Sequence, residues 1–188
     1  MPEKRLLLLR HAKSSWATEG VDDHDRPLAP RGDRAAVLVG TFLVQQEIRP
    51  DLVLCSTAMR ARQTAERVLA QCAPDAPVQY VEGLYLATPR QIRSVIAGVA
   101  ETCGVLLVVG HNPGLHEFAC TLAAAGPPEA LARLQQGMPT AALAAFALAA
   151  RWRAETTLTV AWIAERLGVG SRGYLNPLLY RRRKARDE

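Results

Sequence analysis

The sequence predicts an α/β protein, in which a mostly parallel sheet is covered by helices on both faces as a three-layer α/β/α sandwich. Two apolar runs, Leu6–Leu9 and Val105–Val109, are too short for typical helices and have the unbroken hydrophobicity of strands buried on both faces. Segments with apolar residues at helical spacing alternate with such runs along the chain. Strands that alternate with helices pair in parallel and are joined by right-handed crossovers.

Helical periodicity defines the elements of the first half of the chain. Gly32–Glu47 carries apolar residues three and four positions apart, which predicts a helix. A second short apolar strand is expected at Leu52–Cys55, followed by a helix that ends at about Gln71. Val78–Val81 predicts a third strand that is less buried than the others.

The second half continues the same alternation. Pro89 is well placed in the first turn of a helix that is expected to reach Thr102, before the strand at Val105–Val109. Helices are predicted over Leu115–Ala124 and Glu129–Gln135. Thr140–Ala150 is rich in alanine and compatible with a helix, but the β/α rhythm favours a final strand at the edge of the sheet.

Length and composition fit a globular protein with one main domain. A chain of 188 residues with 49% hydrophobic and 22% charged residues can bury one core and carry a small appendage. No apolar run approaches the ~20 residues of a membrane span, and the N-terminus lacks a small-residue cleavage site, so a cytoplasmic location is expected. The cysteines are widely spaced, which favours reduced thiols: Cys55, Cys72, Cys103 and Cys120.

Three of the predicted strands end in a cation or an imidazole. Arg10 and His11 follow the first strand, Arg60 comes soon after the second, and His111 follows the strand at Val105–Val109. Ligands of open α/β sheets bind beyond the carboxyl ends of the strands, so these four side chains are expected to meet at one rim. Two arginine forks and two imidazoles suit a dianionic phosphoryl group, and imidazole is a competent nucleophile.

The same residues resemble the motifs of the histidine phosphatase superfamily, which has the phosphoglycerate-mutase-like fold. Three motifs in the expected order carry the resemblance: Leu9-Arg10-His11-Ala12, Ser56–Ala65 and Val109–Pro113. Further similarities are closest to the small phosphohistidine phosphatases of the SixA type: Asp25–Leu28, Arg31-Gly32 and Met138–Ala142. The resemblance covers about Lys4 to Trp152.

The resemblance implies that His11 is the nucleophile and becomes phosphorylated, and that Arg10, Arg60 and His111 bind the phosphoryl group. No metal or cofactor is implied. Ala12 stands where the superfamily usually has glycine, a change that SixA-like members often tolerate and that disfavours a mutase. Only about 40 residues separate Arg60 from the next long buried strand, too few for the large helical lid of bigger relatives. A shallow site open to protein side chains is expected.

The proton donor is open among three carboxylates. Asp23 and Asp25 lie on the loop after the first strand, and Glu82 follows the third strand, near the place where larger relatives carry their acid. Glu82 has the alternative role of capping a helix, and Asp25 that of pairing with Arg26. A phosphohistidine leaves as an imidazole, which needs less help from an acid than an alkoxide does.

Several other side chains have simpler interpretations. Arg62 lies on a different helix face from Arg60 and is expected to be solvated or salt-bridged. Three residues after the first motif either contact phosphate or the entrance, or only shape and pack the loop: Ser14, Ser15 and Trp16. Two histidines are interpreted as ordinary loop or surface residues: His24 and His116. No short-spaced carboxylate–histidine cluster predicts a metal site.

The C-terminal part carries the whole excess of positive charge. The net charge is +5, and Arg151–Glu188 holds nine basic and four acidic residues, so the preceding part is balanced. We expect a phosphatase domain over residues 1–153 and a basic helical extension over residues 154–188. A helix at Val160–Leu167, a glycine turn and a second basic helix resemble the helix-turn-helix of some transposase-like proteins. Pro177 and the lack of a third helix favour a packed amphipathic hairpin instead.

These features predict a phosphatase that works through phospho-His11. Its expected partner is a protein that bears phosphohistidine, for example a phosphotransfer domain. A small-molecule phosphomonoesterase of the same fold is the alternative within enzymes. Outside enzymes, the alternative is a nucleic-acid-binding role of residues 154–188, which predicts affinity that falls steeply with salt. No membrane partner is expected.

Overall fold

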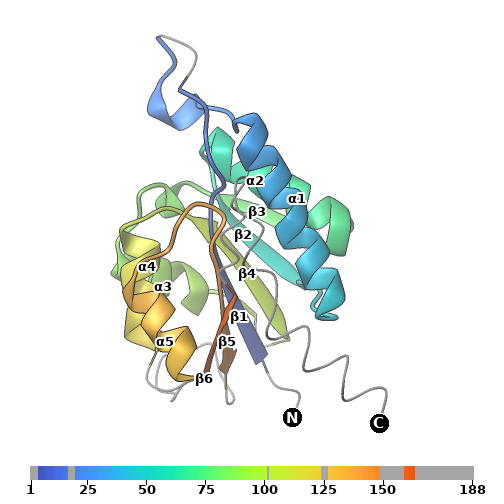
Figure 1. Ribbon diagram of the computed structural model, residues 1–188, viewed down its shortest axis with the longest axis vertical. Coiled ribbons are helices and arrows are strands. Elements are labelled where there is room, and N and C mark those ends of the chain that lie inside the picture. The colour runs from blue at the N-terminus through green and yellow to red at the C-terminus, as the bar shows by residue number, and fades with distance from the viewer. Residues whose placement is uncertain (1–3, 17–19, 101, 124–126, 149–158, 164–188) are drawn as a thin grey trace.

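A mixed six-stranded sheet lies at the centre of the computed structural model (Figure 1). The structure describes residues 4–16, 20–100, 102–123, 127–148 and 159–163. The sheet has the order β3-β2-β4-β1-β5-β6. Its strands are Lys4–Arg10 (β1), Leu52–Ser56 (β2), Val78–Val81 (β3), Val105–Gly110 (β4), Leu143–Leu148 (β5) and Thr159–Ile163 (β6). Strands β1 to β4 run parallel, whereas β5 is antiparallel to β1 and β6 is antiparallel to β5.

Helices cover both faces of this sheet, which confirms the predicted three-layer α/β/α sandwich (Figure 1). One face is covered by α1 (Pro30–Gln45) and α2 (Met59–Cys72). The other face is covered by α3 (Pro89–Ala97), α4 (Gly114–Leu122) and α5 (Pro128–Gln135). Two short 3-10 turns, η1 (Asp23–Asp25) and η2 (Glu82–Leu84), lie after β1 and β3.

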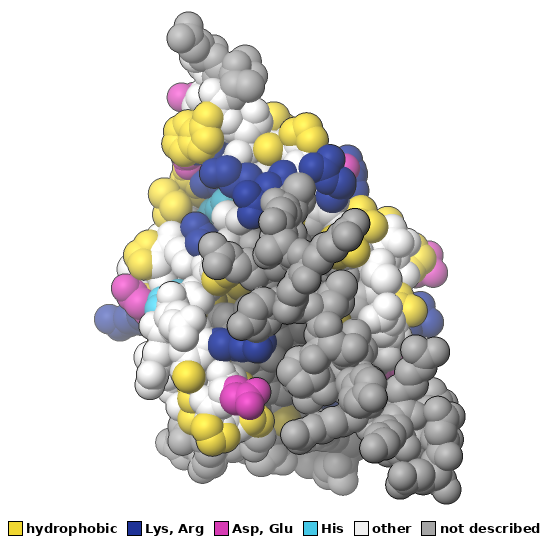
Figure 2. Space-filling model, in the orientation of Figure 1, with side chains coloured by type: hydrophobic (Ala, Val, Ile, Leu, Met, Phe, Trp, Pro, Cys, Tyr) yellow, Lys and Arg dark blue, Asp and Glu magenta, His cyan; other side chains and the backbone are white. Residues whose placement is uncertain are grey.

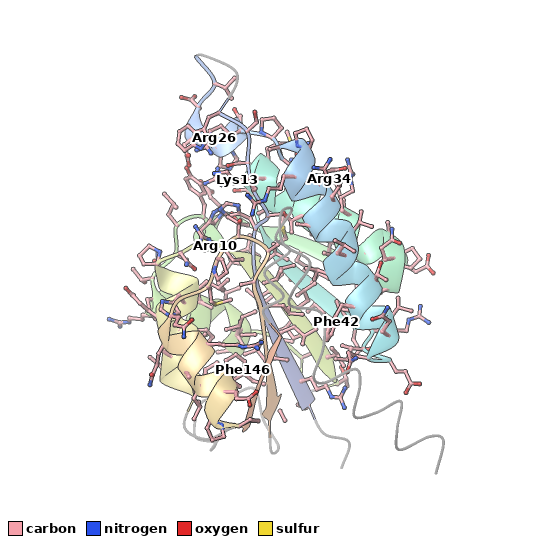
Figure 3. All side chains as sticks on the ribbon, in the orientation of Figure 1. Arg10, Lys13, Arg26, Arg34, Phe42 and Phe146 are labelled. Atoms are coloured by element: carbon pink, nitrogen blue, oxygen red, sulfur yellow. The ribbon has the colours of Figure 1, made fainter. Side chains whose placement is uncertain are left out.

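The four leucines of β1 alternate between two cores. Leu6 and Leu8 pack in the core beneath α3, α4 and α5, while Leu7 and Leu9 pack in the core beneath α1 and α2. Burial of each such side chain stabilises the fold by about 1.5–3 kcal/mol. This continuous apolar strand therefore fixes the position of the residues that follow it. Figure 3 shows Phe146 of β5 and Phe42 of α1 on the two sides of the sheet.

Two predicted elements need comment: one helix is shorter than predicted, and one segment that was compatible with a helix is a strand. Helix α3 ends at Ala97, because Gly98 forms its C-cap, and the predicted extension to Thr102 is wrong. At its start, Thr88 and Gln91 form a capping box, and Pro89 occupies the first helical position. The alanine-rich segment after residue 140 forms strand β5, because its backbone pairs with β1, so the predicted strand is confirmed. Its predicted position at the edge of the sheet is wrong, because β6 pairs with its other side.

The first part of the predicted C-terminal helix is a strand. Thr159–Ile163 pairs with β5 in an antiparallel register that places Val160 opposite Phe146. The prediction of a helix from Val160 is therefore wrong for these residues, since threonine, valine, tryptophan and isoleucine favour the pleated sheet. The other residues of 154–188, and the domain boundary predicted at residue 153, lie outside the described residues. No helix in the described ranges has the length and apolar character needed to cross a membrane.

Candidate active site

The carboxyl ends of β1 and β4 bring two histidines together. These strands are parallel neighbours with Arg10 beside Gly110, so the residues that follow them also lie side by side. The ring centroids of His11 and His111 are 5.0 Å apart, with the ring planes at 50°. The structure thus places the two histidines side by side, as their positions after the predicted strands indicated.

The hydrogen bonds of His11 fix which ring nitrogen carries the proton. Nδ1 lies 2.8 Å from the carbonyl oxygen of Ala12, and a carbonyl oxygen accepts hydrogen bonds but cannot donate. The hydrogen of the neutral ring is therefore on Nδ1, and the Nε2 lone pair is available to accept. Burial is the main cause that lowers the pKa of His11 to about 4, and the charges of Arg60 and Arg10 lower it further. The ring is neutral at pH 7.

A hydroxyl group orients the second histidine. Ser56 Oγ accepts the backbone N–H of Ala58 at 3.4 Å and lies 2.8 Å from His111 Nε2, so its own hydrogen is available for that nitrogen. The other ring nitrogen, Nδ1, is buried and has no hydrogen-bond partner among the described residues. Burial, followed by the charge of His11 and that of Arg60, lowers the pKa of His111 to about 3.

Arg60 contacts both His11 and the loop after β1. It is the second residue of α2, and its Nε donates to His11 Nε2 at 3.3 Å. One terminal nitrogen of its guanidinium donates to Asp23 Oδ2 at 2.8 Å, and the other donates to the Asp23 carbonyl oxygen. Arg60 is almost fully buried. An arginine in this position presents a fixed positive charge to any group bound at His11 Nε2.

A main-chain carbonyl oxygen holds the Arg10 guanidinium. Its Nη1 donates to the carbonyl oxygen of Met138 at 2.7 Å, and the same oxygen accepts Nδ2 of Asn112 at 2.9 Å. Arg10 Nε is buried and has no partner among the described residues. The Arg10 charge lowers the pKa of both His11 and His111. Two guanidiniums and two imidazoles therefore meet at this edge of the sheet, as the sequence predicts.

The Asp23 carboxylate accepts hydrogen bonds from three side chains. It accepts Arg26 Nη1 at 2.6 Å, Arg60 Nη2 at 2.8 Å and the Tyr85 hydroxyl at 2.8 Å. Burial alone would raise the pKa of Asp23, but the hydrogen bonds from Tyr85 and Arg60 outweigh it, and the pKa lies below its ordinary value. An ionised carboxylate at neutral pH does not donate a proton. Asp23 is placed to orient arginines, which disfavours its predicted alternative as the proton donor.

Arg26 anchors the loop that follows His11. Its guanidinium donates to Ser14 Oγ and to the carbonyl oxygen of Ser15, and it stacks on the Trp16 ring with 3.3 Å to the centroid. Ser14 and Ser15 are thus engaged in shaping the loop. Trp16 is 74% exposed beside this loop. Gly32 supports the loop from behind, because a Cβ at that position would lie 2.1 Å from the carbonyl oxygen of Lys13.

The other two predicted carboxylates are not equivalent. Asp25 pairs with His24 at 3.0 Å, so the predicted alternative of a pair with Arg26 is wrong; Arg26 instead pairs with Asp23. Glu82 is exposed at the start of η2. Within the described residues, no hydrogen bond or ion pair joins the Glu82 carboxylate to either catalytic-site histidine.

Two other residues that the sequence analysis considered, His116 and Arg62, make contacts apart from the two histidines. His116 donates from Nε2 to the Leu134 carbonyl oxygen at 2.7 Å and ties α4 to α5, in keeping with a structural role. The Arg62 guanidinium lies 4.8 Å from the Tyr80 ring centroid, apart from the contacts of Arg60. No group of three or more His, Cys, Asp or Glu side chains in the described ranges is placed to hold a metal ion.

Sequence reasoning missed three residues of this site. Tyr85 stands edge-on to His111 with the ring centroids 5.4 Å apart, and it also stands edge-on to His24 at 5.0 Å. Ser56 binds His111, and Thr57 binds His24 at 2.9 Å. The position of the last two at the carboxyl end of β2 was an available signal, whereas no local pattern marks Tyr85.

Comparisons with known proteins agree with this geometry. The family model of the histidine phosphatase superfamily (branch 1) matches residues 6–85. An uncharacterised protein of Mycobacterium tuberculosis is 44% identical over 146 residues, which cover 77% of this chain and 89% of that protein. The putative phosphohistidine phosphatase SixA of Agrobacterium tumefaciens is 34% identical, with a TM-score of 0.69 over 80% of this chain and 95% of that chain.

A second solved structure covers more of the chain. The putative phosphohistidine phosphatase SixA of Nakamurella multipartitia is 30% identical, with a TM-score of 0.77 over 89% of this chain and 99% of that chain. The motifs, the fold and these relatives all point to one group of proteins. This chain belongs to the histidine phosphatase superfamily and is similar to its SixA-type members.

Proposed function

We propose that this phosphatase transfers the phosphoryl group of its substrate to Nε2 of His11, and that the substrate is phosphohistidine on a protein. The single observation that carries the first part is the hydrogen-bond pattern of His11. Nδ1 is committed to the Ala12 carbonyl oxygen, while Nε2 keeps its lone pair and faces the Nε–H of Arg60. A neutral imidazole with a fixed tautomer is a ready nucleophile.

In the first step, Nε2 of His11 attacks phosphorus. An N–P bond forms as the bond between phosphorus and the leaving group breaks, and the leaving group takes up a proton. Charge develops on the phosphoryl oxygens in the transition state. Arg10 and Arg60 hold permanent positive charge at this place. The buried Nδ1 of His111 has no partner among the described residues, and in this proposal it carries the ring hydrogen and donates to an oxygen. Preorganised donors of this kind stabilise the transition state.

In the second step, water attacks the phosphorus of phospho-His11. A new P–O bond forms, the N–P bond breaks, and the electron pair returns to Nε2 as inorganic phosphate leaves. Ala12 keeps the His11 ring oriented through both steps, because its carbonyl oxygen accepts the Nδ1 hydrogen throughout. None of the steps requires a metal ion.

Three observations support a protein substrate. The SixA proteins of A. tumefaciens and N. multipartitia are described as putative phosphohistidine phosphatases. In the described residues between Arg60 and β4, the chain forms only α2, β3, η2 and α3, without a large lid. Two large apolar side chains, Trp16 and Leu86, are exposed next to residues that contact the site. A protein surface can cover side chains of this kind.

The charge of the surface also suits a phosphorylated partner. On the face shown in Figure 2, lysine and arginine side chains gather around a visible histidine. Figure 3 places Lys13, Arg26 and Arg34 in this region. A local positive potential attracts an anionic substrate even though the charge of residues 1–150 is balanced.

The proposed substrate is tested with a panel of phosphoryl donors. We expect the protein to release phosphate faster from a histidine-phosphorylated protein than from sugar and nucleotide phosphates at equal concentration. Faster release from a small phosphate ester would replace the proposed substrate with the phosphomonoesterase alternative. Radiolabelled phosphoryl donor should label the wild-type chain with an acid-labile, base-stable phosphate, and His11→Asn should remove both label and turnover. Label that persists in His11→Asn would contradict the covalent step.

Nucleic-acid binding by the basic segment of residues 154–188 stays a prediction. Its nucleic-acid binding would fall steeply with salt and disappear when the chain is cut after Trp152. If residues 1–153 form the phosphatase domain, the phosphatase activity should persist after that cut. The cut also removes β6, so a loss of activity would show that the domain extends to this strand. The cytoplasmic location likewise stays a prediction.

A further inference from the structure

The described active site contains no carboxylate that is arranged to deliver a proton. Asp23 accepts three hydrogen bonds from charged or hydroxyl donors, which favour its ionised form. Glu82 is exposed at the start of η2. The phosphoryl transfer nevertheless releases a leaving group that takes up a proton. A different side chain near the two histidines is therefore a candidate to carry this proton.

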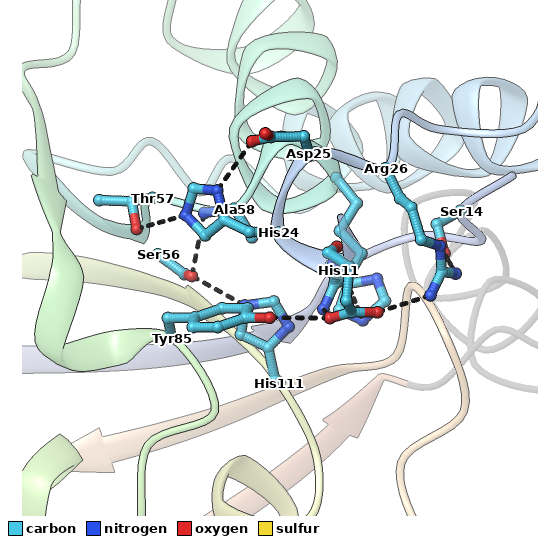
Figure 4. A network of polar contacts seen from close by, with 12 residues as sticks. His11, Ser14, His24, Asp25, Arg26, Ser56, Thr57, Ala58, Tyr85 and His111 are labelled. Atoms are coloured by element: carbon cyan, nitrogen blue, oxygen red, sulfur yellow. Dashed lines mark hydrogen bonds and ion pairs between the residues drawn. The ribbon is translucent and has the colours of Figure 1, made fainter. Parts of the chain in front are cut away.

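His24 has the hydrogen-bond pattern of an acid–base histidine. Its Nδ1 lies 3.0 Å from Asp25 Oδ1, and its Nε2 lies 2.9 Å from Thr57 Oγ1 (Figure 4). An ionised carboxylate only accepts hydrogen bonds, so Nδ1 carries a hydrogen and Nε2 of the neutral ring presents its lone pair to the hydroxyl. Carboxylate, imidazole and hydroxyl follow each other in the order that serves proton transfer in many hydrolases.

This His24–Asp25 pair belongs to the wall of the site. The His24 ring stands edge-on to Tyr85, whose ring stands edge-on to His111. Its hydroxyl partner, Thr57, directly follows the serine that binds His111. The residue before His24 holds the Arg60 guanidinium through both its carboxylate and its carbonyl oxygen. The His24 side chain is 40% exposed, so it is accessible to a substrate.

We propose that His24, held by Asp25, is the general acid–base residue of this phosphatase. The assignment rests on the covalent step at His11 proposed above. When the N–P bond to His11 forms, protonated His24 gives its Nε2 proton to the departing oxygen or nitrogen. When water attacks phospho-His11, neutral His24 takes a proton from that water and is reset. Asp25 keeps the Nδ1 hydrogen in place in both steps.

The leaving group provides the decisive test. His24→Gln keeps an amide that can bind the Thr57 hydroxyl but cannot shuttle a proton. We expect kcat/KM of this variant to fall about 10²-fold or more on glycerol 2-phosphate, whose alkoxide needs protonation. On 4-nitrophenyl phosphate, whose phenolate leaves without a proton, kcat/KM should change little. A defect of folding or of phosphate binding would lower both values equally.

Matched variants complete the experiment. His116→Gln removes a histidine outside the site and should leave both kcat/KM values unchanged. Asp25→Asn should show a smaller loss than His24→Gln, with the same selectivity for the alkyl ester. Equal losses on the two esters in His24→Gln, or no loss on either, would overturn the assignment of His24 while His11-dependent turnover of the wild type stands. Wild-type turnover that does not need His11 would overturn both proposals.

Discussion

Asp23 Oδ2 lies 2.8 Å from a terminal nitrogen of Arg60, and this contact couples the loop after β1 to the start of α2. The same carboxylate also holds Arg26 at 2.6 Å, and Arg26 in turn holds Ser14. The loop after His11 and the Arg60 side chain are thus parts of one polar network. The orientation of Arg60 depends on a residue that does not need to touch the substrate.

Asp23→Asn is expected to lower kcat/KM about 10-fold, mainly through a higher KM. Hydrogen bonds to charged groups contribute about 1.5–3 kcal/mol, and the half-exposed carboxylate of Asp23 places the effect at the low end. Steady-state kinetics on 4-nitrophenyl phosphate measures the change. Asp22→Asn is the control, because the contact of Asp22 in the turn, among the described residues, is made by its backbone carbonyl, which accepts the N–H of Asp25. Unchanged KM in Asp23→Asn would contradict its orienting role.

Arg60→Lys is expected to lower kcat/KM by at least about 10²-fold, although the positive charge is retained. Lysine presents one point charge and cannot contact His11 and both acceptor oxygens of Asp23 in the way that the planar guanidinium does. Arg62→Lys serves as the matched control on the same helix, since Arg62 lies over Tyr80. Its kcat/KM should match that of the wild type. A similar loss in both variants would point to a general effect on α2.

The two buried histidines predict a loss of stability in weak acid. The pKa of His11 is lowered to about 4 and that of His111 to about 3, while both titrate near 6.5 in the unfolded chain. Between these values the unfolded state binds more protons, so the free energy of unfolding falls as the pH is lowered below about 6.5. The loss should be on the order of 1–2 kcal/mol for each histidine at about pH 5.

Urea unfolding at a series of pH values measures this loss. His11→Gln removes one of the two titrating groups and should have a shallower dependence on pH than the wild type. His116→Gln should keep the wild-type dependence. Asp23 adds a loss only at lower pH, because its folded pKa lies below its ordinary value of 3.8. The same steep fall in His11→Gln as in the wild type would show that other groups are responsible.

Gly32→Ala is expected to destabilise the fold by about 1–3 kcal/mol and to lower activity as well. Its Cβ would lie 2.1 Å from the Lys13 carbonyl oxygen, so either α1 or the loop after His11 must move. Chemical unfolding and kinetics on one sample measure the two effects. Gly83→Ala is the control, because its Cβ would meet no atom within 4 Å. Wild-type stability in Gly32→Ala would contradict the tight contact.

The central sheet and the two arginines and two histidines at its edge could be predicted because they obey rules that act along the chain. Leu6–Leu9 and Val105–Val109 are apolar on both faces, which restricts them to the interior of a sheet. Parallel neighbours then align their carboxyl ends, and Arg10, His11 and His111 follow directly. The start of the C-terminal segment was mispredicted as a helix, because its pairing with β5 is a long-range contact that local spacing does not encode.

The parts of the site that sequence reasoning missed depend on side chains from separate loops. Tyr85 contacts Asp23 through a hydrogen bond that spans 62 residues. His24 was interpreted as an ordinary loop residue, and only the fold shows its ring beside Tyr85. Such contacts leave no periodic signal. The spacing of Asp23 and Arg26, three positions apart, was the one local indication of an ion pair.

The Met138 carbonyl oxygen, which accepts both Arg10 and Asn112, has a consequence for how this protein tolerates mutation. Replacing residue 138 exchanges a side chain but leaves the amide oxygen in the polymer backbone. A substitution at that position therefore alters the packing of the interior but keeps the carbonyl oxygen that accepts hydrogen bonds from the residues after β1 and β4. The hydrogen bonds that position Arg10 and Asn112 therefore do not depend on which side chain residue 138 carries.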